Sequence, residues 1–466
     1  MLSLMLYYYS LNLLNKQLIM TDTIVKKLNS SPAARWTVLI VVAFTMFCGY
    51  FITDVMAPLM DLLKVEFDWT ATEYGIFNMA YGWLNVFLFM LIIGGIVLDK
   101  LGIRITGVLS CSLMIIGCGL KYYAVSQAFE GEIFGLRTQV FLACIGFAIF
   151  ALGIEMTGIT VTKVIVRWFK GYEMALAMGI QVAVARLGTA LAMSTAIPMT
   201  ESFKSLSAPI LLGLGALCIG LITFLVFCVM DRKLDASTTN LEKEKEEPFR
   251  IKDISFIIKN KGFWLIAILC VLFYSAVFPF LKYATSLMIN KYNVAPELAG
   301  TIPALLPFGT ILLTPLFGGI YDRKGKGATI MIIGSLILII VHTLFALPLL
   351  NVWWFAASLM ILLGVGFSLV PSAMWPSVPK IIPENKLGTA YSMIFWVQNI
   401  GLSLVPLLIG WVLDKYCILA DGRFDYTIPM IIFTCFGILA FITAWFLRLE
   451  DKKKNYGLEK PNMKKA

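Results

Sequence analysis

The chain has 466 residues, of which 59% are hydrophobic and 14% are charged, and its mean hydropathy is +0.85. Soluble globular proteins carry roughly 25% charged residues, so this composition excludes a water-soluble protein. The net charge of +10 would suggest nucleic-acid binding in a soluble chain, but here the basic residues gather in particular loops and no nucleic-acid-binding motif accompanies them.

Long apolar runs recur along the whole chain, and a spanning helix needs roughly 20 mainly apolar residues. The predicted spans are 36–60, 74–98, 105–124, 138–166, 173–197, 207–230, 263–289, 299–321, 328–348, 352–378, 387–413 and 427–448. They predict an all-α polytopic membrane protein with twelve transmembrane helices in two six-helix bundles, residues 36–230 and 263–448.

Three segments lie outside the two bundles. Residues 1–35 are expected to form a cytoplasmic N-terminal segment, 231–262 a solvated cytoplasmic linker, and 449–466 a basic cytoplasmic tail. Met1 to Met20 are apolar but lack the basic region and small-residue cleavage site of a signal peptide, and both methionines stand as candidate start residues.

The distribution of basic residues predicts the orientation, because loops on the cytoplasmic side carry an excess of lysine and arginine. With both termini inside, the cytoplasmic side receives Lys26, Lys27, Arg35, Lys100, Arg104, Arg167, Lys170, the basic residues of the linker, Arg323, Lys324, Lys326, Lys380, Lys386, Lys452, Lys453 and Lys454. Loops on the other side are acidic or sparse in charge, as in Asp61, Glu66, Asp68 and Glu73.

One short motif occurs twice, at the same loop of each bundle. Its members are Gly95, Asp99, Lys100, Gly102 and Arg104 between the second and third spans, and Gly318, Asp322, Arg323, Gly325 and Lys326 between the eighth and ninth. Glycines permit the tight turn, and an aspartate at a span end can cap a neighbouring helix and pair with a basic residue. The repeat predicts a gating latch; a plain tight turn with exposed charges is the alternative.

On these residues the chain resembles the major facilitator superfamily across essentially all of 36–448. Four stretches resemble a narrower branch, that of the lysosomal dipeptide uniporter and its bacterial relatives. They are GYFITDVMAP (49–58), VRWFKGYEMALAMGIQVAVARLGTALAM (166–193), AVFPF (276–280) and MWPSVPKIIPENKLGTAYSMIFWVQNIGLSL (374–404). The resemblance implies transport of dipeptides or similar zwitterions, and a uniport mechanism.

Charged residues at membrane depth are costly and indicate functional sites. Glu155 in the fourth span and Arg186 in the fifth lie near mid-depth, where they can either pair with each other or bind the two ends of a zwitterion. The resemblance implies that Arg186 meets the substrate carboxylate and Glu155 its ammonium, and the planar guanidinium suits a carboxylate.

Three further charges lie in spans. Asp54, which shares a helical face with Tyr50, is expected to be either a hydrogen-bonded helix-end acid, a second ammonium contact or a proton-coupling site. For Lys282 and for Lys163 the preferred interpretation is a side chain that extends toward the membrane surface.

Uncharged polar and aromatic residues complete the predicted substrate-binding lining. Asn78, Tyr81 and Asn85 recur on one face of the second span, and helix–helix hydrogen bonding is the alternative role for each amide. The predicted substrate-binding set is Tyr50, Asp54, Tyr81, Asn85, Glu155, Gln181, Arg186, Tyr274, Trp375, Gln398 and Asn399.

Several kinds of chemistry find no support in the sequence. The single histidine, His342, cannot form a metal site or catalytic triad, the nine cysteines show no metal-ligand spacing, and no Walker motif is present. We therefore expect no cofactor, no metal and no enzymatic activity.

The preferred hypothesis is a monomeric carrier of zwitterionic solutes, most specifically dipeptides, that works by rocker-switch alternating access. Its expected partners are the lipid bilayer and a small-molecule substrate, with protons as an open co-substrate, no nucleic acid and an accessory subunit left open. The alternatives are an anion carrier centred on Arg186 and a membrane receptor or assembly subunit that carries nothing. The compact loops favour a bacterial inner membrane, and the resemblance also allows a lysosomal one.

Overall fold

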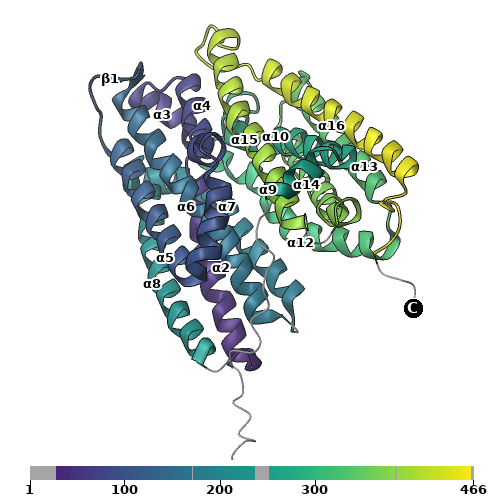
Figure 1. Cartoon of the computed structure of the whole chain (residues 1–466). Helices are drawn as coiled ribbons and strands as arrows, with labels where there is room; N and C mark the ends of the chain where they lie inside the picture. The colour runs from purple at the N-terminus through teal and green to yellow at the C-terminus, as the bar shows by residue number, and fades with distance from the viewer. Residues whose placement is uncertain (1–27, 171, 237–250, 384–385, 463–466) are drawn as a thin grey trace, which may run out of the picture.

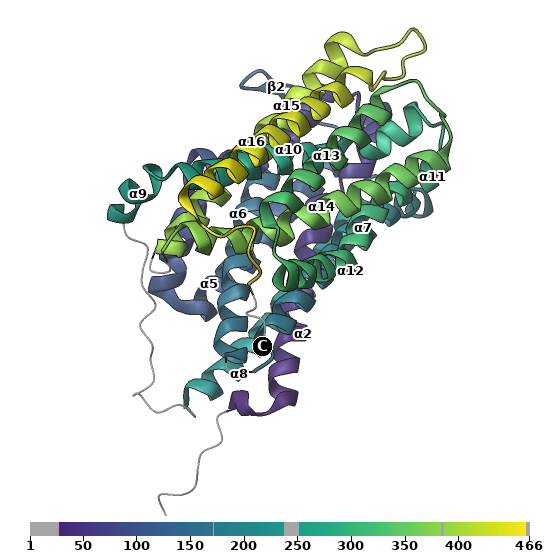
Figure 2. The ribbon, with the colours of Figure 1, turned by 90° about the vertical axis from the view of Figure 1, so that its right-hand side faces the viewer.

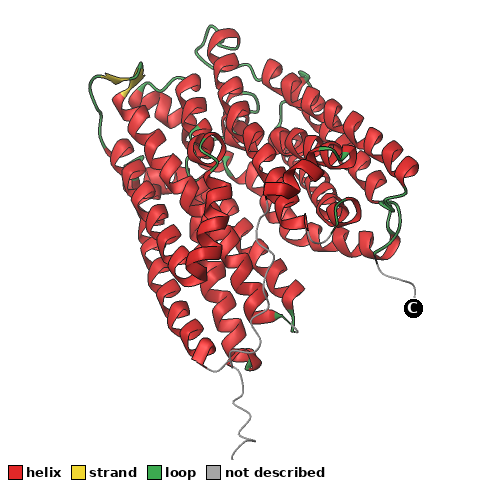
Figure 3. Cartoon of the chain, in the orientation of Figure 1, coloured by secondary structure: helices red, strands yellow, loops and turns green. Residues whose placement is uncertain are grey.

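The computed structural model describes residues 28–170, 172–236, 251–383 and 386–462, and almost all of them are helical (Figure 3). Residues 1–27, which include both candidate start methionines, lie outside the described residues. The described residues of the first half are 28–170 and 172–236, and those of the second half are 251–383 and 386–462. The two halves stand side by side in Figure 1.

The first half contains six spans after the short turn η1 (Leu28–Ser30). Its elements are α2 (Pro32–Asp54), η2 (Ala57–Leu59), α3 (Met60–Phe67), α4 (Ala71–Met79), the π-helix η3 (Trp83–Phe87), α5 (Met90–Ser126), β1 (Glu132–Ile133), β2 (Leu136–Arg137), α6 (Thr138–Phe169), α7 (Met174–Phe203) and α8 (Ala208–Ala236). The two strands pair as one small antiparallel hairpin.

The second half repeats this plan. Its elements are α9 (Ile251–Ile258), α10 (Lys261–Asn290), α11 (Pro296–Ala299), α12 (Thr301–Lys324), α13 (Gly327–Ala346), α14 (Trp353–Ile381), α15 (Leu387–Tyr416) and α16 (Thr427–Lys454). Of the range 231–262, expected to be a solvated linker, the described parts are helical: α8 runs on to Ala236 with Asp231 buried, and α9 and the start of α10 occupy 251–262.

Eleven helices in the described ranges are long and apolar enough to cross a membrane, although twelve spans are predicted. The difference lies in the second span, which is broken into α4, η3 and the first part of α5. The 37-residue α5 also contains the third span, because Gly102 (φ 75°, ψ 171°) interrupts its helical geometry. The chain therefore turns at Gly102, and the fold has the twelve spans that the sequence predicts.

The loops on one side of the bundle hold both copies of the motif, and we call this side the motif end. The opposite side, which holds 55–73, β1, β2 and the turn 417–426, is the far end (Figure 1). The halves meet mainly through α4 with α15 and α7 with α12, and the latter pair also run side by side in Figure 2.

The far end brings the backbones of the two halves very close together. A Cβ on Gly75 would lie 2.7 Å from Pro406 O, and a Cβ on Gly410 would lie 2.1 Å from Ala71 O. Only glycine leaves room for such an approach. The halves are thus tightly packed against each other where α4 crosses α15.

Candidate functional site

A cavity of about 290 Å³ lies between the two halves, and both halves line it. The first half contributes Met46, Tyr50, Thr53, Asp54, Asn78, Tyr81, Phe147, Ile154, Glu155, Gly158 and Arg186. The second half contributes Tyr274, Phe278, Pro279, Lys282, Trp375, Phe395, Gln398, Asn399, Leu402 and Pro406. Nine of the eleven residues predicted to bind substrate are in this lining.

Asn85 and Gln181 are the two predicted residues that do not line the cavity. Asn85 is fully buried in η3 and donates to Tyr81 O at 3.2 Å. A π-turn holds more residues per turn than an α-helix, so the seven-residue spacing from Asn78 no longer returns to the same face. Gln181 lies five residues before Arg186, a rotation of roughly 140° on an α-helix.

The first span breaks beside the cavity. α2 ends at Asp54, and Pro58, which has no N–H, follows within one turn. A helix end leaves its last carbonyls without partners, and two lysines meet them here. Lys121 Nζ donates to Ile52 O at 2.8 Å, and Lys282 Nζ donates to Thr53 O at 3.0 Å.

Asp54 and Lys282 form an ion pair between the halves, with Lys282 Nζ 2.6 Å from Asp54 Oδ1. Thr189 on α7 donates to the other carboxylate oxygen of Asp54 at 2.7 Å. The interpretation of Lys282 as a side chain that extends toward the membrane surface is therefore wrong, since its ammonium points into the protein and bonds across the halves.

Glu155 and Arg186 both face the cavity but are not bonded to each other among the described contacts. Tyr81 donates to Glu155 Oε1 at 2.7 Å. The guanidinium of Arg186 lies over the rings of Tyr50, Phe278 and Phe367, with its Cζ 5.1–5.7 Å from their centroids. The alternative of a direct ion pair between Glu155 and Arg186 is therefore wrong for this structure. Among the described contacts, Glu155 is hydrogen-bonded to Tyr81 and Arg186 lies over aromatic rings.

Aromatic and amide side chains of the second half close the other wall. Trp375 Nε1 donates to Tyr274 Oη at 3.1 Å, and the Trp375 ring stacks on Phe395 at a centroid distance of 4.8 Å. Asn399 donates to Phe395 O at 3.0 Å, while its own side-chain oxygen is buried without a partner among the described residues.

Sequence reasoning missed Lys121, which is fully buried and lies near the rings of Phe147 and Phe150. It also missed the pairing of Lys282 with Asp54. Pro58 could have indicated these contacts from the sequence. A proline just after a helix predicts helix-end carbonyls without N–H partners, which buried lysines can satisfy. The buried His342, by contrast, bonds Ala276 O through Nε2 at 2.9 Å within the second half.

At the motif end the two copies of the motif have different partners. In the first half Asp99 pairs with Lys163 at 2.9 Å, and Arg104 pairs with Asp235 at 2.8 Å. Both side chains of the first pair are partly exposed, so this contact does not contradict the interpretation of Lys163 as a side chain that extends toward the membrane surface. In the second half the Asp322 carboxylate accepts from Asn462 at 2.8 Å. These contacts stay within one half, so the gating role of the motif stays a prediction.

The C-terminal segment also covers the second motif loop. Backbone N–H groups of Lys326 and Gly327 donate to Glu459 O and Leu458 O at 3.0 and 2.9 Å. Part of the expected basic tail is therefore docked against the bundle.

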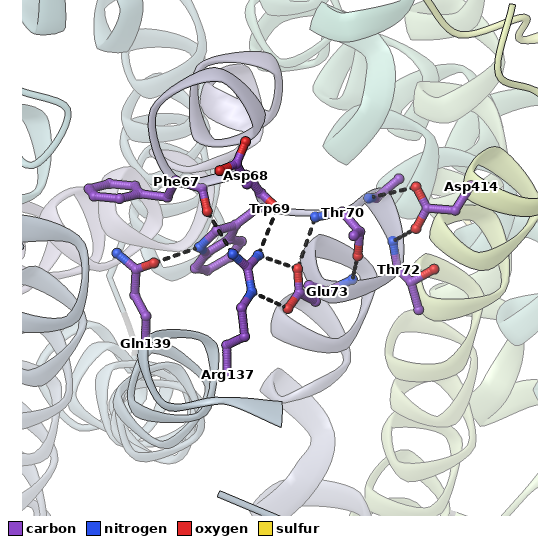
Figure 4. Close-up of polar contacts among 10 residues, drawn as sticks. Phe67, Asp68, Trp69, Thr70, Thr72, Glu73, Arg137, Gln139 and Asp414 are labelled. Atoms are coloured by element: carbon purple, nitrogen blue, oxygen red, sulfur yellow. Dashed lines mark hydrogen bonds and ion pairs between the residues drawn. The ribbon is translucent and has the colours of Figure 1, made fainter. Parts of the chain in front are cut away.

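At the far end, polar contacts cross between the halves. Asp414 of α15 accepts from the N–H groups of Ala71 and Thr72, at 2.9 and 2.6 Å, where the N-terminus of α4 favours a negative charge. Figure 4 shows this contact beside Arg137, whose guanidinium bonds both carboxylate oxygens of Glu73.

Arg137 also fixes the loop before α4, since it donates to Phe67 O at 2.7 Å and to Asp68 O at 2.9 Å (Figure 4). The hydrogen bond to Glu73 raises the pKa of Arg137 above its usual value. Further contacts between the halves run from Ser286 to Asp61 and from Lys64 to Gly422 O.

The chain is similar in sequence to known membrane transporters. The lysosomal dipeptide transporter MFSD1 of Mus musculus is 28% identical over 397 residues, which covers 83% of this chain and 82% of that protein. The Homo sapiens protein of the same name is 28% identical over 398 residues, covering 83% and 81%.

Solved structures share the fold at low identity. The nucleoside transporter NupG superposes with a TM-score of 0.68 at 15% identity, covering 89% of this chain and 98% of that one. A bacterial homolog of the human lysosomal transporter Spinster, in an inward-facing and occupied conformation, superposes with a TM-score of 0.65 at 13% identity, covering 91% and 98%.

A family model for the Major Facilitator Superfamily matches residues 39–406 and 285–464. Those matches include both motif copies and every residue that lines the cavity. The two repeated bundles, the central cavity and the sequence match agree, and the chain belongs to the Major Facilitator Superfamily.

Proposed function

We propose that this member of the family carries dipeptides, or zwitterions of similar length, between the two sides of a membrane by alternating access. One observation carries the proposal: Arg186 and Glu155 present opposite charges to a single cavity without an ion pair between them. A dipeptide has a carboxylate for the guanidinium and an ammonium for the carboxylate. The MFSD1 relatives, which are named as lysosomal dipeptide transporters, support the same substrate class.

The walls of the cavity suit variable side chains. Tyr274, Trp375 and Phe395 offer aromatic surface with few fixed donors, and apolar or aromatic lining with a few placed polar groups is typical of small-molecule sites. The two charged anchors would therefore fix the backbone length of the cargo, and the aromatic wall would tolerate different side chains.

The mechanism follows from the repeat architecture. Transporters built from such repeats rock one bundle against the other about a site near the membrane midplane. In this conformation polar contacts join the halves at the far end, while the ion pairs of the first motif copy and the hydrogen bond of the second stay within their own halves. With both termini cytoplasmic, as the basic loops indicate, this is a state open to the cytoplasm. A bacterial inner membrane is the proposed location.

The direct test is uptake of a labelled dipeptide, such as alanyl-alanine, into proteoliposomes that contain the purified protein. We expect saturable uptake that Arg186→Ala and Glu155→Gln each reduce at least tenfold, with an unchanged elution profile showing that both variants fold. Normal uptake by Arg186→Ala would remove the assignment of the carboxylate site. Counterflow with and without a pH gradient separates uniport, which we propose, from coupling to protons.

A second candidate is a carrier of small organic or inorganic anions. It is favoured by the observation that Asp54 is already paired with Lys282, so that Arg186 is the charge in the cavity with neither an acidic nor a hydrogen-bonding partner among the described residues. Such a carrier would lose transport in Arg186→Ala but keep it in Glu155→Gln, and a dipeptide would not compete with its substrate.

A further inference from the structure

The end of α2 offers a ready set of acceptors for an ammonium group. The carbonyl of Thr53 and the Oδ1 atom of Asp54 both bond Lys282 Nζ, at 3.0 and 2.6 Å. The C-terminal end of a helix carries partial negative charge, so it favours a cation beyond the effect of Asp54 itself. Both Thr53 and Asp54 line the central cavity.

Two lysines serve this helix end, but they belong to different halves. Lys121 on α5 reaches Ile52 O from inside the first half and is fully buried. Lys282 on α10 reaches Thr53 O and Asp54 from the second half, and its side chain is 15% exposed. Lys121 therefore moves with α2, whereas Lys282 moves with the opposite half.

Opening of the far end must separate Lys282 from its acceptors. Tyr74 of α4 donates to Lys282 O at 2.9 Å, and Ser286, one turn later on α10, donates to Asp61 at 3.0 Å. These contacts cross the same boundary, so they break together when the halves rock apart. Asp54 keeps its orientation, because Thr189, which donates to it at 2.7 Å, lies in the same half.

After that separation the acceptors are assembled but empty. A primary ammonium with three donors is the group that they bind now, and the amino terminus of a dipeptide is the same chemical group. A carboxylate that loses its partner in a partly dry site attracts a new cation strongly. The vacated position therefore suits the amino terminus of a substrate that enters from the far end.

We infer that Thr53 O and Asp54 form one ammonium position that Lys282 and the substrate amino group occupy in turn. When the far end closes, Lys282 returns to Asp54 and displaces the amino group into the cavity, where Glu155 can accept it. This inference rests on the proposed function for its substrate, and it makes Lys282 a residue that determines specificity for free amino groups.

The conformational part of the inference, that Lys282 helps to hold the far end closed, is tested without any substrate. Spin labels on Glu66→Cys of α3 and Ala420→Cys of the 417–426 turn, both exposed at the far end, report the distance between the halves. The native exposed cysteines, Cys218 and Cys435, are replaced first. In the full-length protein we expect Lys282→Met to move at least half of the distance distribution to longer separations.

Lys121→Met is the matched control, because it removes the same kind of bond from the neighbouring carbonyl within one half. It is expected to keep the wild-type distance distribution. An unchanged distribution in Lys282→Met, or an equal shift in Lys121→Met, would overturn the inference. The double variant Asp54→Asn/Lys282→Met, which has no unpaired charge, must show the same opening as Lys282→Met.

The substrate-binding part of the inference is tested by comparing the binding of alanyl-alanine with that of N-acetyl-alanyl-alanine, which lacks the ammonium group. If Lys282 holds the site in about nine of ten molecules, its removal should tighten alanyl-alanine binding about tenfold, with no gain for the acetylated ligand. Weaker binding, or equal gains for both ligands, overturns the inference. A wild-type protein that binds no dipeptide would instead overturn the proposed function. The distance measurement would still test whether Lys282 holds the far end closed.

Discussion

At the scale of single residues, the cavity separates charges that could neutralise each other. Tyr81 holds the Glu155 carboxylate at 2.7 Å, and three aromatic rings surround the Arg186 guanidinium. A buried carboxylate that loses its donor costs about 1–3 kcal/mol, and a guanidinium over rings gains about 0.5–2 kcal/mol per contact. The protein thus stabilises each charge with a group that leaves it free for a ligand.

Arg186→Lys tests the role of the planar guanidinium. The ammonium keeps the charge but loses both the ring stacking and the fork that fits a carboxylate. We expect the KM for alanyl-alanine to rise about tenfold, equivalent to about 1.4 kcal/mol of binding free energy, with similar expression and elution. An unchanged KM would show that only the charge matters.

Tyr81→Phe tests the hydrogen bond to Glu155, and Tyr50→Phe is its matched control. Both tyrosines line the cavity, but only Tyr81 donates to a carboxylate among the described contacts. Thermal unfolding in detergent should show Tyr81→Phe less stable by about 1–3 kcal/mol and Tyr50→Phe nearly as stable as wild type. Equal losses would contradict this reading.

At the scale of elements, breaks in helices are what give the fold its site and its turns. α2 ends at Asp54 beside the cavity, η3 turns Asn85 away from it, and Gly102 divides α5 into two spans. Residue periodicity found the spans and correctly placed Tyr81, but it could not find η3, because a π-turn has no clear sequence signal and changes the face of everything after it.

Gly102→Ala tests the turn within α5, with Gly95→Ala as the control in the same motif. Gly102 has φ 75° and ψ 171°, a conformation that costs other residues about 1–3 kcal/mol. Gly95 is helical, and an added Cβ there meets no atom within 4 Å. We expect Gly102→Ala to lower the unfolding temperature and Gly95→Ala to hold or raise it; the opposite order would refute the proposed strain.

At the scale of the whole molecule, several of the described polar contacts between the two halves lie at the far end, where α4 also packs closely against α15. Away from that end, Trp396 Nε1 donates to Val86 O at 3.1 Å. Asp414 caps the N-terminus of α4 from the opposite half, and Lys282 caps the C-terminus of α2. Helix ends are where backbone groups lack partners, so a partner on the other half stabilises one conformation of the pair and not the other.

The sequence alone determined features that depend on neighbouring residues, but not contacts between residues far apart along the chain. Length, apolar runs and the twin motif determined the twelve spans and the two bundles, because these follow from local hydrophobicity and from repeats along the chain. The family came instead from a resemblance of the motif and of particular stretches to known transporters. The same reasoning found nine residues of the cavity, since charged residues at membrane depth are rare and indicate functional sites.

The sequence did not determine which groups these side chains bond. Glu155 pairs with Tyr81 rather than Arg186, Asp54 with Lys282, and Lys121 with Ile52 O. Packing within the first half brings Tyr81 to Glu155 and Lys121 to Ile52 O. Packing of one half against the other joins Asp54 to Lys282, 228 positions away. Only the tertiary structure could decide these partners, because a buried charge takes whichever polar group the fold brings within reach.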